Sequence, residues 1–135
     1  MAFDSTNEFL ASDKKEHIDA FVCLEALSGN EVATVLDNNS IKGRTVIAMD
    51  TDPATLEWIK KGIIVATIAQ KPYTMAFVGL RMLDILHHQD LPKLDSDWAN
   101  DGFAPLPAFV DTGSQVLDKS NVDSFASAAN SLRGK

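Results

Sequence analysis

The sequence predicts an α/β fold, with a parallel sheet covered by helices on both faces. Three short apolar runs, at residues 18–24, 45–49 and 63–69, are rich in strand-forming residues. A segment with helical spacing of apolar residues follows each run, and this alternation is typical of parallel strands joined by crossover helices. The runs are continuously apolar rather than alternating, which favours strands that are buried on both sides.

Capping residues mark where the expected helices begin and end. Asp52 can accept hydrogen bonds from the free N–H groups of a helix over residues 53–61, Pro53 suits its first position, and Gly62 ends it. Pro72 opens the longest helix, residues 72–88, whose apolar side chains extend so far around it that we expect cover on more than one side. Short strands at 107–110 and 115–117 are then expected before a last helix.

Length and charge exclude several classes of protein. The chain has 135 residues, which suits one domain of ordinary size, and its formal net charge is −7. Nucleic acid requires a basic surface, so we expect no nucleic-acid partner, and the same charge argues against an anionic membrane surface. The single cysteine, Cys23, lies in an apolar run and is interpreted as a buried thiol.

Three of the expected strands end in a polar residue, at Glu25, Asp50 and Gln70. In open parallel sheets, ligands bind beyond the carboxyl ends of the strands. A carboxylate can accept hydrogen bonds from adjacent hydroxyls, and an amide can both donate and accept, so this set suits a polyhydroxylated ligand. Polar residues also end strands simply because turns are exposed, so the pattern alone predicts a binding site at the sheet edge and no more.

Signals for an enzyme are weak in this sequence. It contains no glycine-rich phosphate loop and no Gly-x-Ser-x-Gly motif. His87 and His88 are neighbours on the expected helix, and neighbours on a helix do not face the same side, so one metal ion would not be held easily by both. We therefore expect no catalytic residues, no cofactor and no metal site.

Two stretches of the sequence resemble the type I periplasmic binding proteins for ribose and related sugars. They are Val46–Asp50 and residues 59–75, and the most specific part is ATIAQKP at residues 66–72. The resemblance covers about residues 18–126 and implies a flavodoxin-like lobe. The same fold serves as the effector domain of lactose-repressor-type transcription regulators.

The resemblance implies roles for individual residues. Asp50 matches the acidic residue that holds sugar hydroxyls, and Gln70 matches a glutamine that also contacts the sugar. Glu25 stands where ribose binders usually carry an asparagine, which puts ribose itself in doubt although a carboxylate still suits hydroxyls. The implied function is the binding of a sugar or similar polyol within a periplasmic receptor that serves the membrane permease of an ABC transporter. The alternative is the effector-binding domain of a transcription regulator.

Family members have two lobes and are longer, so the resemblance implies that residues 1–135 form a C-terminal lobe portion without the first lobe. The implied partners are that N-terminal lobe or a complementary chain. An open site cannot bury most of a ligand, so we expect weak or absent sugar binding by this chain alone. Apolar surface from Phe77, Leu80, Phe103 and Phe109 should favour association, and a homo-oligomer is therefore expected.

Overall fold

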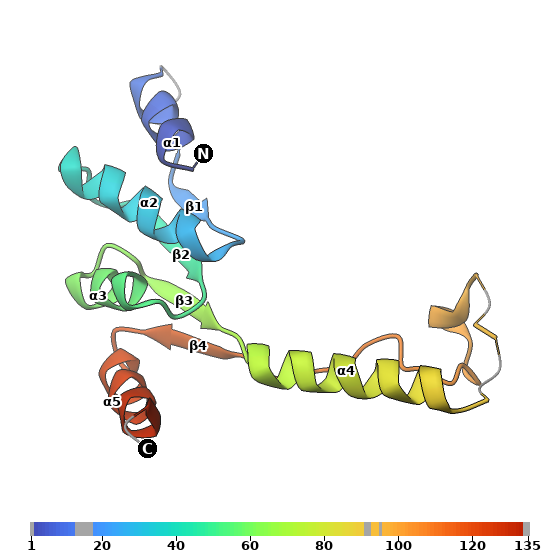
Figure 1. Ribbon diagram of the computed structural model, residues 1–135. Coiled ribbons are helices and arrows are strands. Elements are labelled where there is room, and N and C mark those ends of the chain that lie inside the picture. Colours follow the sequence, from blue (N-terminus) through green and yellow to red (C-terminus); the bar gives the residue numbers. More distant parts are fainter. Residues whose placement is uncertain (1, 13–17, 91–92, 95, 134–135) are drawn as a thin grey trace. The chain divides into compact units, whose positions relative to one another are not determined.

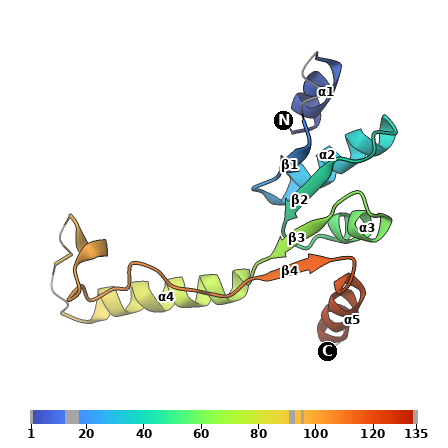
Figure 2. The ribbon, with the colours of Figure 1, turned by 180° about the vertical axis from the view of Figure 1, so that it is seen from behind.

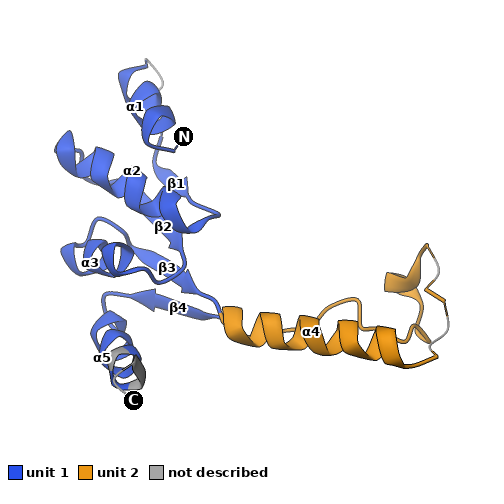
Figure 3. Cartoon of the chain, viewed as in Figure 1, with its two compact units in different colours: residues 1–70, 114–135 blue, residues 71–113 orange. Residues whose placement is uncertain are grey.

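The computed structural model describes residues 2–12, 18–90, 93–94 and 96–133. The chain divides into two compact units, residues 1–70 with 114–135 and residues 71–113 (Figure 3). The first unit carries the sheet, and the second carries the longest helix of the described chain.

The first unit is built on a four-stranded sheet in the order β1-β2-β3-β4 (Figure 1). The first three strands run parallel, whereas β4 pairs antiparallel with β3. The strands are β1 (Ala20–Val22), β2 (Thr45–Met49), β3 (Ala66–Ala69) and β4 (Gln115–Asp118). The helices of this unit are α1 (Ala2–Ala11), α2 (Ala26–Asn38), α3 (Pro53–Lys61) and α5 (Val122–Arg133). The α/β class, the three parallel strands and the helices between them are therefore confirmed.

The strand expected at residues 107–110 does not form. These residues have no ladder partner and all four are exposed. A strand is stabilised by pairing and by burial of one face, and an apolar run such as Ala108-Phe109-Val110 has neither here. The strand expected at 115–117 does form, as β4, but its direction is opposite to that of its neighbour.

The described helices of this unit pack on one face of the sheet, which differs from the expected cover on both faces. Strands that lie side by side in sequence order place successive crossovers of the same hand on the same side. Burial accordingly alternates along the strands: Val46, Ala48 and Leu117 are buried, whereas Val22 is 67% exposed and Val116 is 55% exposed on the other face. Figure 2 gives the reverse view of the sheet.

Polar contacts join the helices into one layer. The backbone N–H of Phe3 in α1 donates to the Glu31 carboxylate in α2 at 2.8 Å. The indole N–H of Trp58 in α3 donates to the Asn30 side chain in α2 at 2.7 Å. Lys60 in α3 lies 3.4 Å from the Asp123 carboxylate in α5. Below this layer, a core that includes Leu36, Ile59 and Ile64 fills the space between helices and sheet.

The second unit contains α4 (Pro72–His88) and a short 3₁₀ helix, Trp98–Asn100. No residue of α4 is buried, so the cover expected on more than one side of this helix is not found within the described residues. The exposure expected for the four apolar side chains of this unit is confirmed; they are Phe77, Leu80, Phe103 and Phe109. None of the described helices combines the length and the apolar character that crossing a membrane requires.

Close contact between α2 and β2 generates a stability prediction. A Cβ on Gly29 would lie 2.6 Å from the Cβ of Ala48, too close for either to keep its position. Gly29→Ala should therefore lower the free energy of unfolding by about 1–3 kcal/mol, measured by urea denaturation. Gly79→Ala in α4 is the matched control, because nothing lies within 4 Å of its Cβ position; alanine there should raise helix stability by up to about 1 kcal/mol. Equal stability of Gly29→Ala and the wild type would contradict the close packing.

Candidate functional site

The three polar residues singled out in the sequence follow the carboxyl ends of β1, β2 and β3. These strands are parallel neighbours, so Glu25, Asp50 and Gln70 all come at the same edge of the sheet. The structure joins two of them directly. The side-chain amide of Gln70 donates to Oδ1 of Asp50 at 2.8 Å, and both residues are half-buried.

The Asp50–Gln70 pair keeps hydrogen-bonding capacity for a ligand. Among the described residues, nothing donates to Oδ2 of Asp50 or to Oε1 of Gln70. The amide of Gln70 has two N–H bonds, and one of them suffices for the contact with Asp50. The pair therefore presents two acceptors and one donor close together, an arrangement that matches adjacent hydroxyl groups.

The backbone of Asp50 is fixed by β3. Its N–H donates to the carbonyl of Ile68 at 2.9 Å, which continues the parallel ladder beyond the end of β2. Its carbonyl accepts from the hydroxyl of Thr67 at 2.8 Å. The φ angle of Asp50 is 69°, in the left-handed region, where aspartate is tolerated better than most residues that have a Cβ. Sequence reasoning missed Thr67, although a threonine inside an apolar strand run is a visible signal.

Asp52, close by in the same turn, caps α3 and does not contribute a free carboxylate. Its side chain accepts from the backbone N–H groups of Ala54 and Thr55, at 3.1 and 3.2 Å, and from the Thr55 hydroxyl at 2.5 Å. Pro53 takes the first turn and Gly62 ends the helix at a φ of 80°, so the predicted boundaries of this helix are confirmed.

Glu25 has a structural task at the start of α2. Its carboxylate accepts from the backbone N–H of Leu27 at 3.3 Å and from the hydroxyl of Ser28, and it forms the N-cap of the helix. The bond from Ser28, followed by that from Leu27, lowers the pKa of Glu25 below its ordinary value. No described contact connects Glu25 with Asp50 or Gln70, so its role as a ligand contact stays a prediction.

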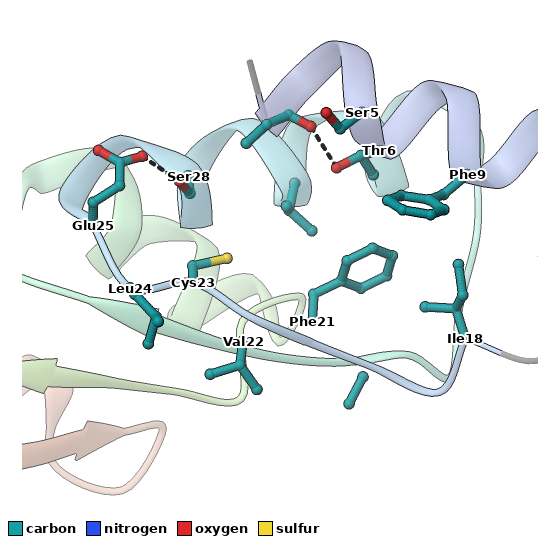
Figure 4. Close-up of a pocket in the computed structure, with 13 residues that line it drawn as sticks. Ser5, Thr6, Phe9, Ile18, Phe21, Val22, Cys23, Leu24, Glu25 and Ser28 are labelled. Atoms are coloured by element: carbon teal, nitrogen blue, oxygen red, sulfur yellow. Dashed lines mark hydrogen bonds between the residues drawn. The ribbon is translucent and has the colours of Figure 1, made fainter.

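An open hollow of about 600 Å³ lies beside β1, between α1 and the start of α2 (Figure 4). The thiol of Cys23 points into it, and Glu25 with Ser28 lies at one end. Burial, together with the nearby Glu25 carboxylate, raises the pKa of the Cys23 thiol, which therefore stays protonated and behaves as an apolar group. The lining is mainly apolar and does not include Asp50 or Gln70, so a polyol is better matched by the Asp50–Gln70 pair.

Metal ions are held by clusters of side chains, and the neighbouring His87 and His88 belong to the described residues. Within those residues, no group of three or more His, Cys, Asp or Glu side chains could hold a metal ion. The rings of His87 and His88 lie edge to face, with centroids 4.7 Å apart. Next to this pair, the Asp84 carboxylate lies 3.2 Å from Nδ1 of His88.

The mostly parallel sheet, with Asp50 and Gln70 in contact beyond the ends of β2 and β3, has the architecture of an α/β protein with polar side chains at one sheet edge. Residues 1–88 match the family model of the periplasmic binding protein domain. The chain belongs to this family, which consists of binding proteins rather than enzymes. No curated protein sequence shows a significant match.

Solved structures of sugar-binding proteins are similar to the chain. The arabinose-binding protein AraP of Geobacillus stearothermophilus is 32% identical, with a TM-score of 0.65 over 92% of this chain and 40% of its own. A sugar-binding protein of a sugar ABC transporter from Bacillus halodurans is 29% identical, with a TM-score of 0.64 over 91% of this chain and 41% of its own. A carbohydrate transporter solute-binding protein from Agrobacterium radiobacter, in complex with D-arabinose, shares the fold at 21% identity and a TM-score of 0.66, over 95% and 38%.

The capping bonds of Glu25 generate a pH prediction. Because its folded-state pKa is the lower one, the Glu25 carboxylate stabilises the fold above its ordinary pKa, and this contribution is lost as the pH falls through the folded-state value. Ser28→Ala should raise the pKa of Glu25 toward its ordinary value in a carboxyl ¹³C NMR titration. Asp118 on β4, whose pKa is lowered mainly by a hydrogen bond from the Ser120 side chain, is the internal control and should not change. An unshifted Glu25 in the variant would contradict the assigned cause.

Proposed function

We propose that the chain binds a sugar or a similar polyol with Asp50 and Gln70, as part of a periplasmic solute-binding receptor that delivers its ligand to the membrane permease of an ABC transporter. The observation that carries the proposal is the 2.8 Å contact between Gln70 and Asp50. It holds the two side chains together and leaves Asp50 Oδ2 and Gln70 Oε1 without a described partner. Hydrogen bonds from hydroxyls to an ionised carboxylate are about twice as strong as neutral ones.

Glu25 is proposed as a further contact at the rim of the same edge. Its carboxylate already accepts from Leu27 and Ser28, so it would contact a ligand only with its remaining acceptor capacity. The ranking of the three residues is therefore Asp50 and Gln70 before Glu25. In the proposed receptor, a second lobe closes over this edge and excludes water, in the manner of hinge-bending binding proteins.

The chain spans about 40% of the length of the solved structures to which it is similar. Ligand sites bury about 70–90% of a small ligand, and we propose that a second lobe completes this burial at the Asp50–Gln70 pair. The proposed receptor is favoured over a lactose-repressor-type regulator because two of the similar structures are described as binding proteins of sugar or carbohydrate transporters.

Sugar titration of the ¹⁵N-labelled chain tests this proposal. D-arabinose and D-fucose should cause saturable shifts of the Asp50 backbone signal and of the Gln70 side-chain amide, with a Kd of about 1 mM or weaker because the proposed second lobe is needed to bury the ligand. Asp50→Ala should weaken binding about tenfold or more, since it removes charge-assisted hydrogen bonds. Asp37→Ala, an exposed acid at the end of α2, is the matched control and should bind as the wild type does.

Three results of the sugar titration would contradict parts of the proposal. The absence of shifts with both sugars at their highest soluble concentrations, or an unchanged Kd in Asp50→Ala, would contradict the assignment of Asp50 and Gln70 as a sugar site. A micromolar Kd for the isolated chain would contradict the argument that a second lobe is needed to bury the ligand.

A further inference from the structure

The backbone conformation of Asp50 needs a physical cause. Its φ of 69° lies in the left-handed region, which is disfavoured for residues that carry a Cβ. The described residues contain one other such case, Ser40 at 55°, whose N–H donates to the Asp37 carbonyl in the turn that follows α2. Asp50 instead follows a strand, so the usual explanation of a helix C-terminus does not apply to it.

Three hydrogen bonds join Asp50 to β3 and to Gln70, the residue that follows it. Ile68 accepts its backbone N–H at 2.9 Å, Thr67 donates to its carbonyl at 2.8 Å, and Gln70 donates to its side chain at 2.8 Å. Two of these hydrogen bonds are already explained: the Ile68 bond continues the parallel ladder, and the Gln70 bond belongs to the proposed ligand site. The hydrogen bond from Thr67 is explained by neither the ladder nor the site.

Thr67 is a polar residue on the buried face of the sheet. It is 0% exposed, and the buried strand residues that share its face are apolar: Val46, Ala48, Ala69 and Leu117. Valine has nearly the same shape, so packing does not require the hydroxyl. A buried hydroxyl costs free energy unless it is hydrogen-bonded, and the carbonyl of Asp50 is the partner that the described structure gives it.

We propose that Thr67 is a positioning residue, whose hydroxyl holds the Asp50 carbonyl and thereby keeps Asp50 left-handed with its carboxylate beside Gln70. The inference rests on the proposed function of Asp50 and Gln70. It adds a buried residue that orients Asp50 without touching the ligand. A carboxylate that is already oriented loses less conformational freedom when a ligand binds, which improves affinity without any new ligand contact.

An alternative cause is the tight turn between β2 and α3. That turn is anchored at its far end by the Asp52 cap, to which the buried Thr55 contributes its hydroxyl at 2.5 Å. If the turn alone determined the conformation of Asp50, the Thr67 hydroxyl would be dispensable. Thr55 therefore supplies a matched control, because it is a second fully buried threonine whose hydroxyl binds in the same turn.

The test uses Thr67→Val and Thr67→Ala, which remove the hydroxyl, and Thr67→Ser, which keeps it. Without any sugar, backbone chemical shifts report the φ of Asp50, and hydrogen exchange of the Gln70 side-chain amide reports its bond to Asp50. We expect both hydroxyl-free variants to lose the left-handed signature of Asp50 and to exchange the Gln70 amide faster. Thr67→Ser and Thr55→Val should keep both signals as in the wild type.

Sugar titration forms a separate arm. Loss of one hydrogen bond that orients the site should raise the Kd for D-arabinose about fivefold to tenfold in the hydroxyl-free variants, with near wild-type values for Thr67→Ser and Thr55→Val. A left-handed Asp50 with a protected Gln70 amide in folded Thr67→Val or Thr67→Ala overturns the inference whatever the sugar does. Failure of the wild type to bind any sugar contradicts the proposed function instead, while the sugar-free measurements still decide the role of Thr67.

Discussion

The parallel pairing of β2 with β3 is the constraint on which the proposed site depends. That ladder does not stop where the strand ends, because the N–H of Asp50 still donates to the carbonyl of Ile68. The extra bond carries Asp50 along with the sheet and brings it within reach of the residue that follows β3, which is Gln70. Without this pairing, the two side chains would lie on separate turns, and no shared set of donors and acceptors would exist.

Acidic residues at this edge divide between two tasks. Glu25 and Asp52 satisfy the free N–H groups at the starts of α2 and α3, where a negative charge also interacts favourably with the helix dipole. Asp50 lies just ahead of a helix but caps nothing in the described structure, and it binds a side-chain amide instead. An acid beyond a parallel strand is therefore a better ligand candidate when another residue already performs the capping.

Sequence patterns predicted most helices and strands of this fold, but not which faces of the sheet are covered or which strands pair. The runs that form β1, β2 and β3 could be predicted because they are short, continuous stretches of β-branched and apolar residues, unlike the spaced apolar residues of a helix. The bounds of α3 could be predicted because Asp52 is a typical N-cap, Pro53 suits the first turn and Gly62 ends a helix. The one-sided cover of the sheet and the missing strand at 107–110 depend on long-range pairing, which local patterns do not contain. The proximity of Asp50 and Gln70 could be expected because both directly follow neighbouring strands, and their role as ligand contacts stays a prediction. The capping role of Glu25 depends on where the Ser28 hydroxyl lies, and the role proposed for Thr67 depends on a hydrogen bond between strands, so neither could be expected from local sequence.

The described helices of the first unit cover one face of the sheet, and this has a consequence for how the strands find their alignment. Side chains alternate between the two faces of a strand, so sliding a strand by one position exchanges its inner and outer sets. In β4, such a slip would move Leu117 out of the core and bring Val116 in, and in β3 it would replace Thr67 and Ala69 by Ala66 and Ile68. A sheet buried on both sides would be nearly indifferent to that exchange, but this one is not, so its asymmetry selects a single alignment during folding.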